Sequence, residues 1–343
     1  MKDIAIWRDV TPQMFHDEIR PIGEPAVLKG LVDDWPVVSV AREGDRPLAD
    51  YLASLAAPGP IASVYAAPEI EGRFHYTENL RKLNFDRVSI PLDNFLDQLI
   101  AEKDCERPTS LAAQGLLVPK CLPGFGAQHR LSILPPSVVP RMWIGNAVKV
   151  ATHSDELENV ACVVAGRRRF TLFPPEQLGN LYMGPFELTP AGTPISMVHV
   201  TRPDLERYPR FSEALDAASF AELEAGDAIY IPYQWYHHVE SLDPVSILVN
   251  YWWDPARQDL GSPWDAMLHG IISLRGLPPD QRRAWRAAFD HYVFLSNGDV
   301  SAHLPPHARG ILAADTPQDI EELRRDLIKN LTSSSAEKSG PLK

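Results

Sequence analysis

Cysteine is scarce in this chain, which has three cysteines among 343 residues. Their number is odd, and no two of them have the C-x-x-C spacing. The sequence therefore predicts neither a disulfide framework nor a zinc site built from cysteine pairs. Cys162 lies in an apolar run, so we expect it to be a small core residue.

Basic residues and long apolar runs are lacking as well. The chain has 33 Lys and Arg against 45 Asp and Glu, which gives a formal net charge of −12. This charge opposes binding to bare nucleic acid and to anionic membranes, so we expect neither partner. No run approaches eighteen apolar residues, and residues 1–7 lack the apolar segment of a signal peptide. We therefore expect a cytoplasmic protein.

What the chain does have is a composition of 45% hydrophobic and 23% charged residues, which is ordinary for a globular domain. Its middle is β-rich, and most of the short runs there are not separated by helices of ordinary length. These runs are residues 142–144, 150–152, 160–165, 168–173, 228–231 and 245–252. The pattern predicts a mainly β fold with flanking helices, whose core is a double-stranded β-helix, or jelly roll. Residues 178–209, rich in Pro, Tyr and Gly, are expected to form a loop across the mouth of the barrel.

Two stretches carry candidate metal ligands. If residues 151–155 run as a strand, His153 and Asp155 project from the same face, because side chains alternate along a strand. A second β-rich run ends at Pro232 and offers His237 a few residues later. Two histidines and one carboxylate form the facial triad that holds non-haem Fe(II) with open positions. The plainer alternative for His153 and Asp155 is a hydrogen-bonded loop pair.

His238 competes with His237 for this role. Neighbouring residues of a strand point to opposite faces, so only one of the two meets the metal. By this alternation His237 shares a face with Trp235 and Val239.

The order of the motifs resembles one enzyme family. The chain reads H-x-D, then G-R-R-R-F-T-L-F-P-P, then G-D-A-I-Y-I-P-x-x-W-x-H-H-V-E-S-L, then V-N-Y-W-W. This series is similar to the cupin-type, JmjC-related 2-oxoglutarate oxygenases, and most similar to the branch of the asparaginyl hydroxylase factor inhibiting HIF and its bacterial cupin-like relatives. The resemblance runs from about residue 25 to residue 253. It implies Fe(II) held by His153, Asp155 and His237, with 2-oxoglutarate and O2 as co-substrates.

Arg168 is the most informative charged residue. It alternates with Phe170 and Leu172, so it lies inside the barrel if those two do. A buried cation is costly without an anion, and a carboxylate suits the forked guanidinium. The family resemblance implies that Arg168 grips the distal carboxylate of 2-oxoglutarate, where the asparaginyl hydroxylase has lysine. The alternative is an exposed arginine in a basic cluster, with Lys149 as the next candidate for the clamp.

Three further residues match family positions near the co-substrate or the metal. Asn250 lies in an otherwise apolar run, Asn159 follows Asp155 by four residues, and Trp252 aligns with an aromatic that lines the pocket. Hydrogen bonding within the fold or core packing is the competing role for each. The chain also departs from the family, because Ser154 replaces an aromatic, and a clamp tyrosine is replaced around residues 112–114.

The spacing of apolar residues changes after residue 253. Apolar residues recur at helical spacing in three segments, around residues 264–272, 285–293 and 320–331, and Thr316-Pro317 caps the last of these. We expect residues 1–254 to form the oxygenase domain, 255–331 a C-terminal helical segment and 332–343 a disordered tail. The helices either pack on the barrel or, as the resemblance implies, form a homodimer.

These observations predict an Fe(II)- and 2-oxoglutarate-dependent oxygenase that hydroxylates a protein side chain or a small molecule. Two alternatives remain. One is a non-catalytic cupin-like protein that binds a metal or ligand. The other is an N-methyl demethylase that uses the same chemistry.

Overall fold

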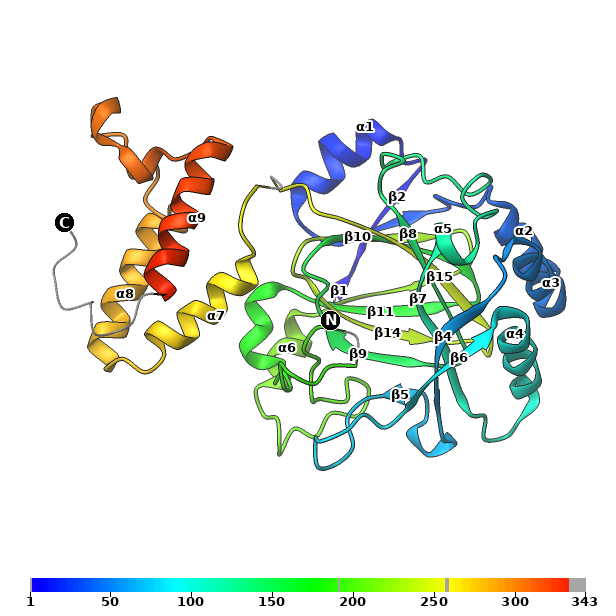
Figure 1. Cartoon of the computed structure of the whole chain (residues 1–343). Coiled ribbons are helices and arrows are strands. Elements are labelled where there is room, and N and C mark those ends of the chain that lie inside the picture. The colour runs from blue at the N-terminus through cyan, green and yellow to red at the C-terminus, as the bar shows by residue number, and fades with distance from the viewer. Residues whose placement is uncertain (1, 191, 257–258, 333–343) are drawn as a thin grey trace. The chain divides into compact units, whose positions relative to one another are not determined.

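A computed structural model of the chain describes residues 2–190, 192–256 and 259–332 (Figure 1). The chain divides into two compact units, Met1–Asp254 and Pro255–Lys343. We call them the barrel unit and the helical unit and describe each by itself. Residues 333–343, most of the tail expected to be disordered, lie outside the described residues.

Two sheets form the framework of the barrel unit. The six-stranded sheet has the order β1 (Lys2–Asp3), β12 (Ser219–Leu223), β11 (Arg168–Phe173), β14 (Tyr236–Ser241), β9 (Lys149–His153) and β5 (Arg73–Phe74). The nine-stranded sheet has the order β2 (Ala5–Arg8), β3 (Ala26–Lys29), β13 (Ala228–Ile231), β10 (Glu158–Ala165), β15 (Ser246–Trp253), β8 (Pro140–Gly145), β7 (Ser110–Leu117), β4 (Pro60–Ala66) and β6 (Asp86–Pro91). The predicted mainly β, cupin-like core is confirmed.

The interior between the two sheets follows from side-chain alternation. On β10, Ala161 and Val163 face the interior and pack against Phe170 and Leu172 of β11. The residues between them face the opposite side, so both faces of β10 are buried. This explains why the strand reads as one continuous apolar run instead of an alternating one.

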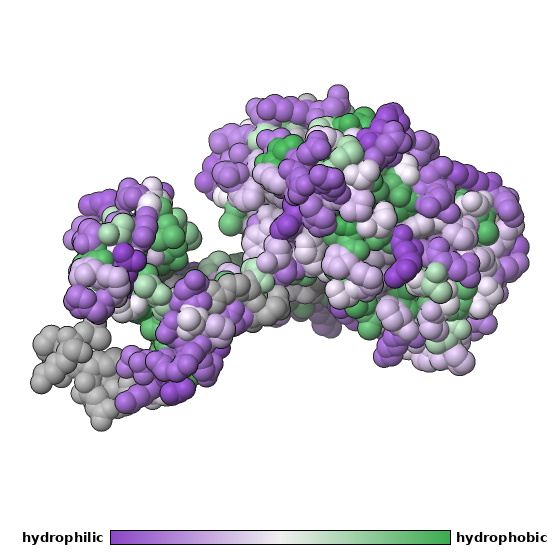
Figure 2. Space-filling model, turned by 90° about the horizontal axis from the view of Figure 1, so that it is seen from above, coloured by the Kyte–Doolittle hydropathy of each residue, from purple (hydrophilic) through white to green (hydrophobic). Residues whose placement is uncertain are grey.

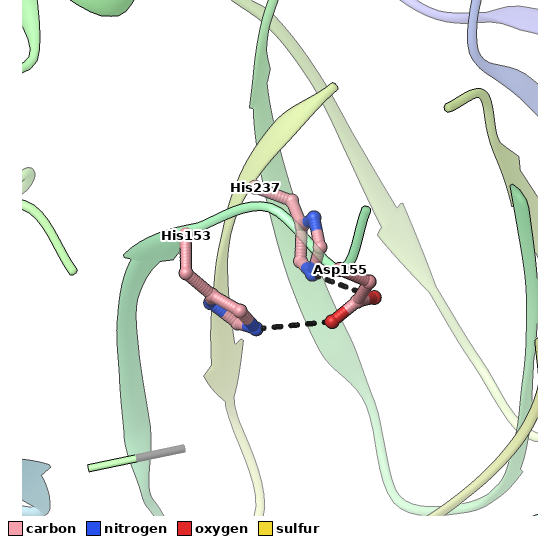
Figure 3. Close-up of side chains that lie close together, drawn as sticks. All are labelled: His153, Asp155 and His237. Carbon is pink, nitrogen blue, oxygen red and sulfur yellow. Dashed lines mark ion pairs between the residues drawn. The ribbon is translucent and has the colours of Figure 1, made fainter. Parts of the chain in front are cut away.

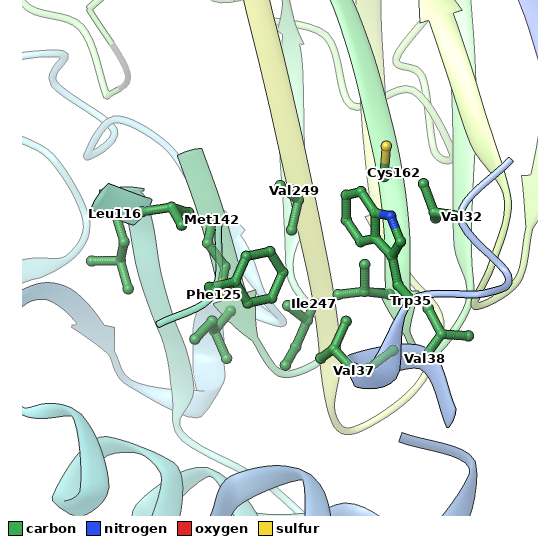
Figure 4. Packing of buried hydrophobic residues seen from close by; sticks show 14 of the residues in the cluster. Val32, Trp35, Val37, Val38, Leu116, Phe125, Met142, Cys162, Ile247 and Val249 are labelled. Atoms are coloured by element: carbon green, nitrogen blue, oxygen red, sulfur yellow. The ribbon is translucent and has the colours of Figure 1, made fainter. Parts of the chain in front are cut away.

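A layer of helices covers the outer face of the nine-stranded sheet. It consists of α2 (Pro36–Glu43), α3 (Asp45–Leu55) and α4 (Leu92–Ala101). Trp35 packs at the start of α2 over Cys162 and Val249 (Figure 4). Cys162 is fully buried, as expected for a core residue, and burial raises the pKa of its thiol.

Short helices complete the barrel unit. They are α1 (Pro12–Met14), which continues as a π-helix over Phe15–Ile19, then α5 (Val118–Cys121) and α6 (Phe211–Ala217). Thr11 caps α1, since its Oγ1 accepts a hydrogen bond from the Met14 amide. The sequence pattern predicted no helix at α2, because residues 37–40 are β-branched residues and serine, which favour strands.

The insertion at residues 178–209 packs differently from our expectation. Its buried residues Leu181, Val198 and Val200 pack against Phe173 and Tyr236, which lie on the outer face of the six-stranded sheet. The apolar side chains of the insertion therefore pack on the outer face of the six-stranded sheet and cover strand surface there that would otherwise be exposed.

The helical unit contains α7 (Pro263–Leu274), α8 (Pro279–Tyr292) and α9 (Pro317–Thr332). Thr316 and Asp319 cap α9 reciprocally, because each side chain accepts a hydrogen bond from the backbone amide of the other. Thr332, placed by the sequence pattern in the tail, instead ends α9. Among the described helices, none is both long enough and apolar enough to cross a membrane.

Candidate metal centre

Two neighbouring strands of the six-stranded sheet bring the candidate ligands together. His153 is the last residue of β9 and His237 the second of β14, and the two are direct cross-strand partners. Their ring centroids lie 4.4 Å apart. Asp155 follows the end of β9 and turns back toward both rings, as Figure 3 shows. The sequence pattern placed Asp155 on the strand, whereas in the structure β9 ends at His153, and Asp155 lies two residues beyond it, directly before Glu156 with its φ of 54°.

The three side chains converge on one point. The Nε2 atom of His153 lies 3.5 Å from Oδ1 of Asp155, and Nε2 of His237 lies 3.5 Å from Oδ2. One potential ligand atom from each residue lies within 4.8 Å of the other two. Two imidazole nitrogens and a carboxylate at this spacing form a donor set for a divalent metal ion.

The other ring nitrogen of each histidine faces a backbone carbonyl. His153 Nδ1 lies 2.9 Å from the carbonyl oxygen of Ala151, and His237 Nδ1 lies 3.2 Å from that of Trp235. A carbonyl can only accept, so each Nδ1 carries the proton. This tautomer leaves both Nε2 lone pairs free for a metal.

Burial and mutual contact set the charge states of the group. Burial lowers the pKa of His237 to about 4. Burial also lowers the pKa of His153, but the contact with Asp155 outweighs it and raises that pKa overall. For Asp155, burial raises the pKa, but His237, His153 and Asn159 together lower it to about 2. The carboxylate is therefore ionised at neutral pH, as a metal ligand must be.

A hydrogen-bond chain from the opposite sheet holds Asp155. Asn159 of β10 donates to Oδ2 of Asp155 at 3.0 Å, and the indole of Trp252 on β15 donates to the same oxygen at 3.1 Å. The amide of Asn250 in turn donates to Oδ1 of Asn159 at 2.9 Å. The three residues proposed from sequence to contact the co-substrate thus form one network around the carboxylate. Partners of this kind orient a metal ligand.

His238 lies on the other face of β14. It is the cross-strand partner of Thr171, which points away from the interior. Burial lowers the pKa of His238 to about 3. The structure therefore brings His237, and not its neighbour, next to His153 and Asp155.

Arg168 is buried inside the barrel. Its side chain crosses from β11 to β15, where Nε donates to Oγ of Ser246 at 2.9 Å. Among the described residues, no carboxylate lies within ion-pair distance of it, whereas Arg167 pairs with Asp243 and Arg169 with Glu222. Burial lowers the pKa of Arg168 to about 9, so the guanidinium stays charged at neutral pH.

The alternative clamp residues lie elsewhere. Lys149 is the cross-strand partner of Glu240 and faces outward. Ala112 and Ala113, where the family has a tyrosine, offer no hydroxyl group. Ser154, where the family has an aromatic residue, donates to the side chain of Gln234 at 3.1 Å. Of the two clamp candidates, Arg168 and Lys149, Arg168 is the one that faces the interior.

Two interior residues were missed by sequence reasoning. Trp143 of β8 faces the interior, and its buried Nε1 has no hydrogen-bond partner among the described residues. Ser246 is fully buried beside Arg168. Side-chain alternation could have identified Trp143 as an interior residue. Its neighbours Met142 and Ile144 belong to the core on the other face of the nine-stranded sheet, so Trp143 faces the interior between the sheets. Nothing in the sequence marked Ser246, which is one serine among many.

Comparisons with known proteins agree with this geometry. A family model described as a cupin-like domain matches residues 12–259. The lysine-specific demethylase JMJ31 of Arabidopsis thaliana is 37% identical over 112 residues, which are 32% of this chain and 20% of that protein. The bifunctional peptidase and (3S)-lysyl hydroxylase JMJD7 of Homo sapiens is 31% identical over 169 residues, 44% of this chain and 52% of that protein. Lysine-specific demethylase 8 of Xenopus tropicalis is 25% identical over 248 residues, 70% of this chain and 50% of that protein. The chain spans at most about half the length of these three relatives.

Proposed function

The chain belongs to the family of cupin-like domains, and from that membership and its metal centre we propose that it is an Fe(II)- and 2-oxoglutarate-dependent oxygenase. The observation that carries the proposal is the convergence of His153, Asp155 and His237 inside the barrel. Two histidines and one carboxylate leave further coordination positions open, which is the arrangement of non-haem Fe(II) oxygenases.

The residues present fit the metal. Both imidazoles direct Nε2 toward the carboxylate, and the pKa of Asp155 is low enough to keep that carboxylate ionised. The donor set contains no thiolate, which disfavours a structural zinc site. When bound, the metal and 2-oxoglutarate supply the oxidising chemistry, and the protein supplies binding and orientation.

The residues present also fit the co-substrate. Arg168 is a buried cation with no acidic partner among the described residues, and its forked guanidinium suits a carboxylate. One buried donor between Arg168 and the triad, Nε1 of Trp143, has no hydrogen-bond partner within the described chain. Buried polar groups are normally paired, so a ligand with acceptor oxygens in this space accounts for both Arg168 and Trp143.

The chain's own groups then have separate tasks. Asn159 and Trp252 hold Oδ2 of Asp155 and so fix the orientation of the carboxylate. Arg168 binds the distal carboxylate and sets the position of the co-substrate along the barrel. Apolar side chains around Phe170 and Leu172 keep water from the space between the sheets, which strengthens the pairing of charges there.

Succinate formation tests the proposal directly. The purified chain, loaded anaerobically with Fe(II) and then given 2-oxoglutarate and O2, is expected to release succinate slowly without any substrate and faster with one. A chain that binds Fe(II) but never forms succinate, with any substrate of a peptide and metabolite screen, would instead be a non-catalytic cupin-like binding protein.

We further propose that the reaction is hydroxylation of a protein side chain or of a small molecule. One of the three relatives above is named a lysyl hydroxylase, and two are named lysine-specific demethylases. Formaldehyde release separates the two outcomes, because an N-methyl group leaves as formaldehyde after it is hydroxylated, whereas hydroxylation elsewhere adds one oxygen to the product.

We propose that the helical unit forms a homodimer. None of the described residues of α7, α8 and α9 is buried, although all three helices carry apolar residues. Figure 2 shows hydrophobic side chains, in green, on the surface of this unit. Ile271, Leu274, Trp285 and Phe289 also line an apolar groove of about 370 Å³ between α7 and α8. Exposed apolar surface of this kind marks interaction sites. A cytoplasmic location stays a prediction, which cell fractionation tests.

A further inference from the structure

A second polar cavity lies on the outer face of the six-stranded sheet, next to β5. Its volume is about 780 Å³, within the range of about 300–1,000 Å³ that is typical of small-molecule sites. Arg73 and His75 line it from the β5 segment, and His199 and Arg202 line it from the insertion. None of the triad residues and none of their hydrogen-bond partners belongs to this lining, so the cavity is separate from the metal centre.

A row of charged side chains crosses the outer face of the sheet and ends at this cavity. Cross-strand pairing joins Arg73 to Lys149, Lys149 to Glu240, and Glu240 to Arg169. Arg169 also forms an ion pair with Glu222 at 2.5 Å, and Glu222 is the last residue of the row. The row thus holds three cations and two carboxylates, and both carboxylates form ion pairs with Arg169. Among the described residues, Lys149 and Arg73, toward the β5 end, therefore form no ion pair.

Of these two cations, Arg73 is the one that lines the cavity. Its side chain is half-buried, and its Nη2 donates a hydrogen bond to the carbonyl oxygen of Met197 at 3.3 Å. Among the described residues, no carboxylate lies within ion-pair distance of it. A guanidinium has five donors, so most of them remain available to a ligand in the cavity.

Carboxylates also line the cavity, but two of the three are already paired. Glu71 forms an ion pair with Arg202 at 2.6 Å, and Glu69 forms one with Arg107 at 2.8 Å. Glu78 is exposed at the rim, where water screens its charge. The deeper part of the cavity therefore keeps the uncompensated positive charge of Arg73.

The two histidines respond to this charge. Burial and then the nearby Arg73 lower the pKa of His75 to about 4, and the same two causes lower the pKa of His199. Arg202 and Lys149 add to the effect at His199. Both imidazoles are therefore neutral at pH 7, and the positive field in the cavity comes from the arginines and the lysine.

We propose that this cavity binds the oxyanion group, a carboxylate or a phosphate, of a small ligand, with Arg73 as its main partner. Planar, forked donors of arginine match the oxygens of both groups. His199 and Asn84, on the same lining, supply further polar contacts. The proposal does not depend on the oxygenase activity, because it uses no residue of the metal centre.

Calorimetry on the full-length protein tests the proposal, with inorganic phosphate and acetate titrated separately against a chloride background of matched ionic strength. Arg73→Gln is expected to weaken binding by at least about tenfold, which corresponds to about 1.4 kcal/mol. Arg8→Gln, at an exposed arginine of β2 in the other sheet, serves as the matched control and should change nothing. The same comparison in the Arg168→Met background removes the cation of the metal-centre site, so that anion bound there does not contribute to the effect of Arg73.

Each outcome decides one point. Binding of phosphate alone assigns the site to phosphorylated ligands, and binding of acetate alone assigns it to carboxylates. Arg73→Lys keeps the positive charge but lacks the forked guanidinium, and it replaces Arg73→Gln in the test if that variant does not fold. Its affinity for the anion is expected to lie between those of the parent and Arg73→Gln. Imidazole nitrogen signals of His75 and His199 should shift on binding. No binding of either anion by the parent, or equal binding by parent and both Arg73 variants, overturns the proposal.

Discussion

The barrel unit and the helical unit depart from the usual distribution of polar and apolar residues in opposite ways. The barrel unit buries groups that prefer water, with Arg168 4% exposed and His237 4% exposed. The helical unit exposes groups that avoid water, with Ile272 81% exposed and Trp285 50% exposed. Burying an unpaired charge costs free energy, and so does leaving large apolar side chains in water.

Each departure is explained by a different kind of partner. A small ligand with a metal ion would satisfy the buried cation and carboxylate of the barrel unit. A second protein surface would cover the apolar residues of the helical unit. In both units, a side chain in an environment that is unfavourable for it indicates a surface or cavity where a partner binds. Substitutions that remove the unfavourable residue from one unit should leave the other unit unaffected.

The largest effect is expected from Asp155→Ala. The change leaves two ligands where three are needed, so turnover should be lost and metal affinity should fall sharply. Titration of Fe(II) into the anaerobic protein measures the affinity, and succinate release measures the turnover. His238→Gln, next to the ligand but on the other face of β14, is the control and should bind metal like the parent. Loss of iron in His238→Gln together with retention in His237→Ala would contradict the assignment.

The second-largest effect is expected from Arg168→Met. It keeps much of the side-chain bulk but removes the charge, and the penalty for truncating one member of a buried charge pair is about 2–5 kcal/mol. The affinity for 2-oxoglutarate should therefore fall by roughly thirtyfold to several thousandfold, while iron still binds. Anaerobic calorimetry on the metal-loaded protein measures both. Arg169→Met is a matched control, because the neighbouring arginine faces outward and pairs with Glu222. Equal affinities in Arg168→Met and the parent would mean that the clamp lies elsewhere.

Acid should destabilise the barrel unit through its buried histidines. The pKa of His75 falls from 6.5 to about 4 on folding, so the unfolded chain binds more protons than the folded chain between these values. Its contribution to stability is present above pH 6.5 and is lost as the pH falls toward 4, by at most about 3 kcal/mol. Thermal unfolding of parent and His75→Gln across this range measures the effect, and the variant should show a flatter pH dependence. Parallel curves would show that His75 does not titrate as inferred.

Asn159→Ala should give a smaller loss at the metal centre. It removes one of the two donors to Oδ2 of Asp155 and leaves Trp252 in place. Removing a partner of this kind typically lowers metal affinity by about 10- to 100-fold. Metal titration measures the change, and Asn180→Ala, in the 3-10 helix after β11, is a control outside the barrel interior. An unchanged affinity would mean that Trp252 alone is sufficient to orient the carboxylate.

The smallest expected effect concerns the helical unit. Ile272→Ser removes one exposed apolar side chain from α7 and should weaken the dimer by about tenfold, since fully burying such a side chain contributes about 1.5–3 kcal/mol. Analytical ultracentrifugation over a range of concentrations gives the dissociation constant. Ser273→Ala, at the adjacent position, is the matched control. Iron binding should be unchanged in both variants. A parent chain that is monomeric at all concentrations would contradict the dimer.

Much of the barrel could be predicted from the sequence, because burial imposes a pattern on strands. The bounds of β11 and β13 agree with the predicted runs, and alternation placed Arg168 inside with Phe170 and Leu172. Helix α2 was missed because the local preference of its β-branched residues is overridden by packing on the sheet. The network of Asn250, Asn159 and Asp155 could not be predicted, because its residues come from different strands and meet only through the register of the sheets.

The register of β11 has a consequence for the choice among 2-oxo acids. Arg168 pairs with Ser241, and Leu172 pairs with His237, so the backbone positions level with the clamp and with the triad lie four residues, or about 13 Å, apart along β11, and the side chains of Arg168 and His237 span part of that distance. Backbone hydrogen bonds fix that spacing, and neither end can slide toward the other. The strand therefore holds the two backbone positions at a fixed separation. We expect a diacid with one carbon fewer or one carbon more than 2-oxoglutarate to bind less tightly, which would be a discrimination by chain length separate from any discrimination by charge.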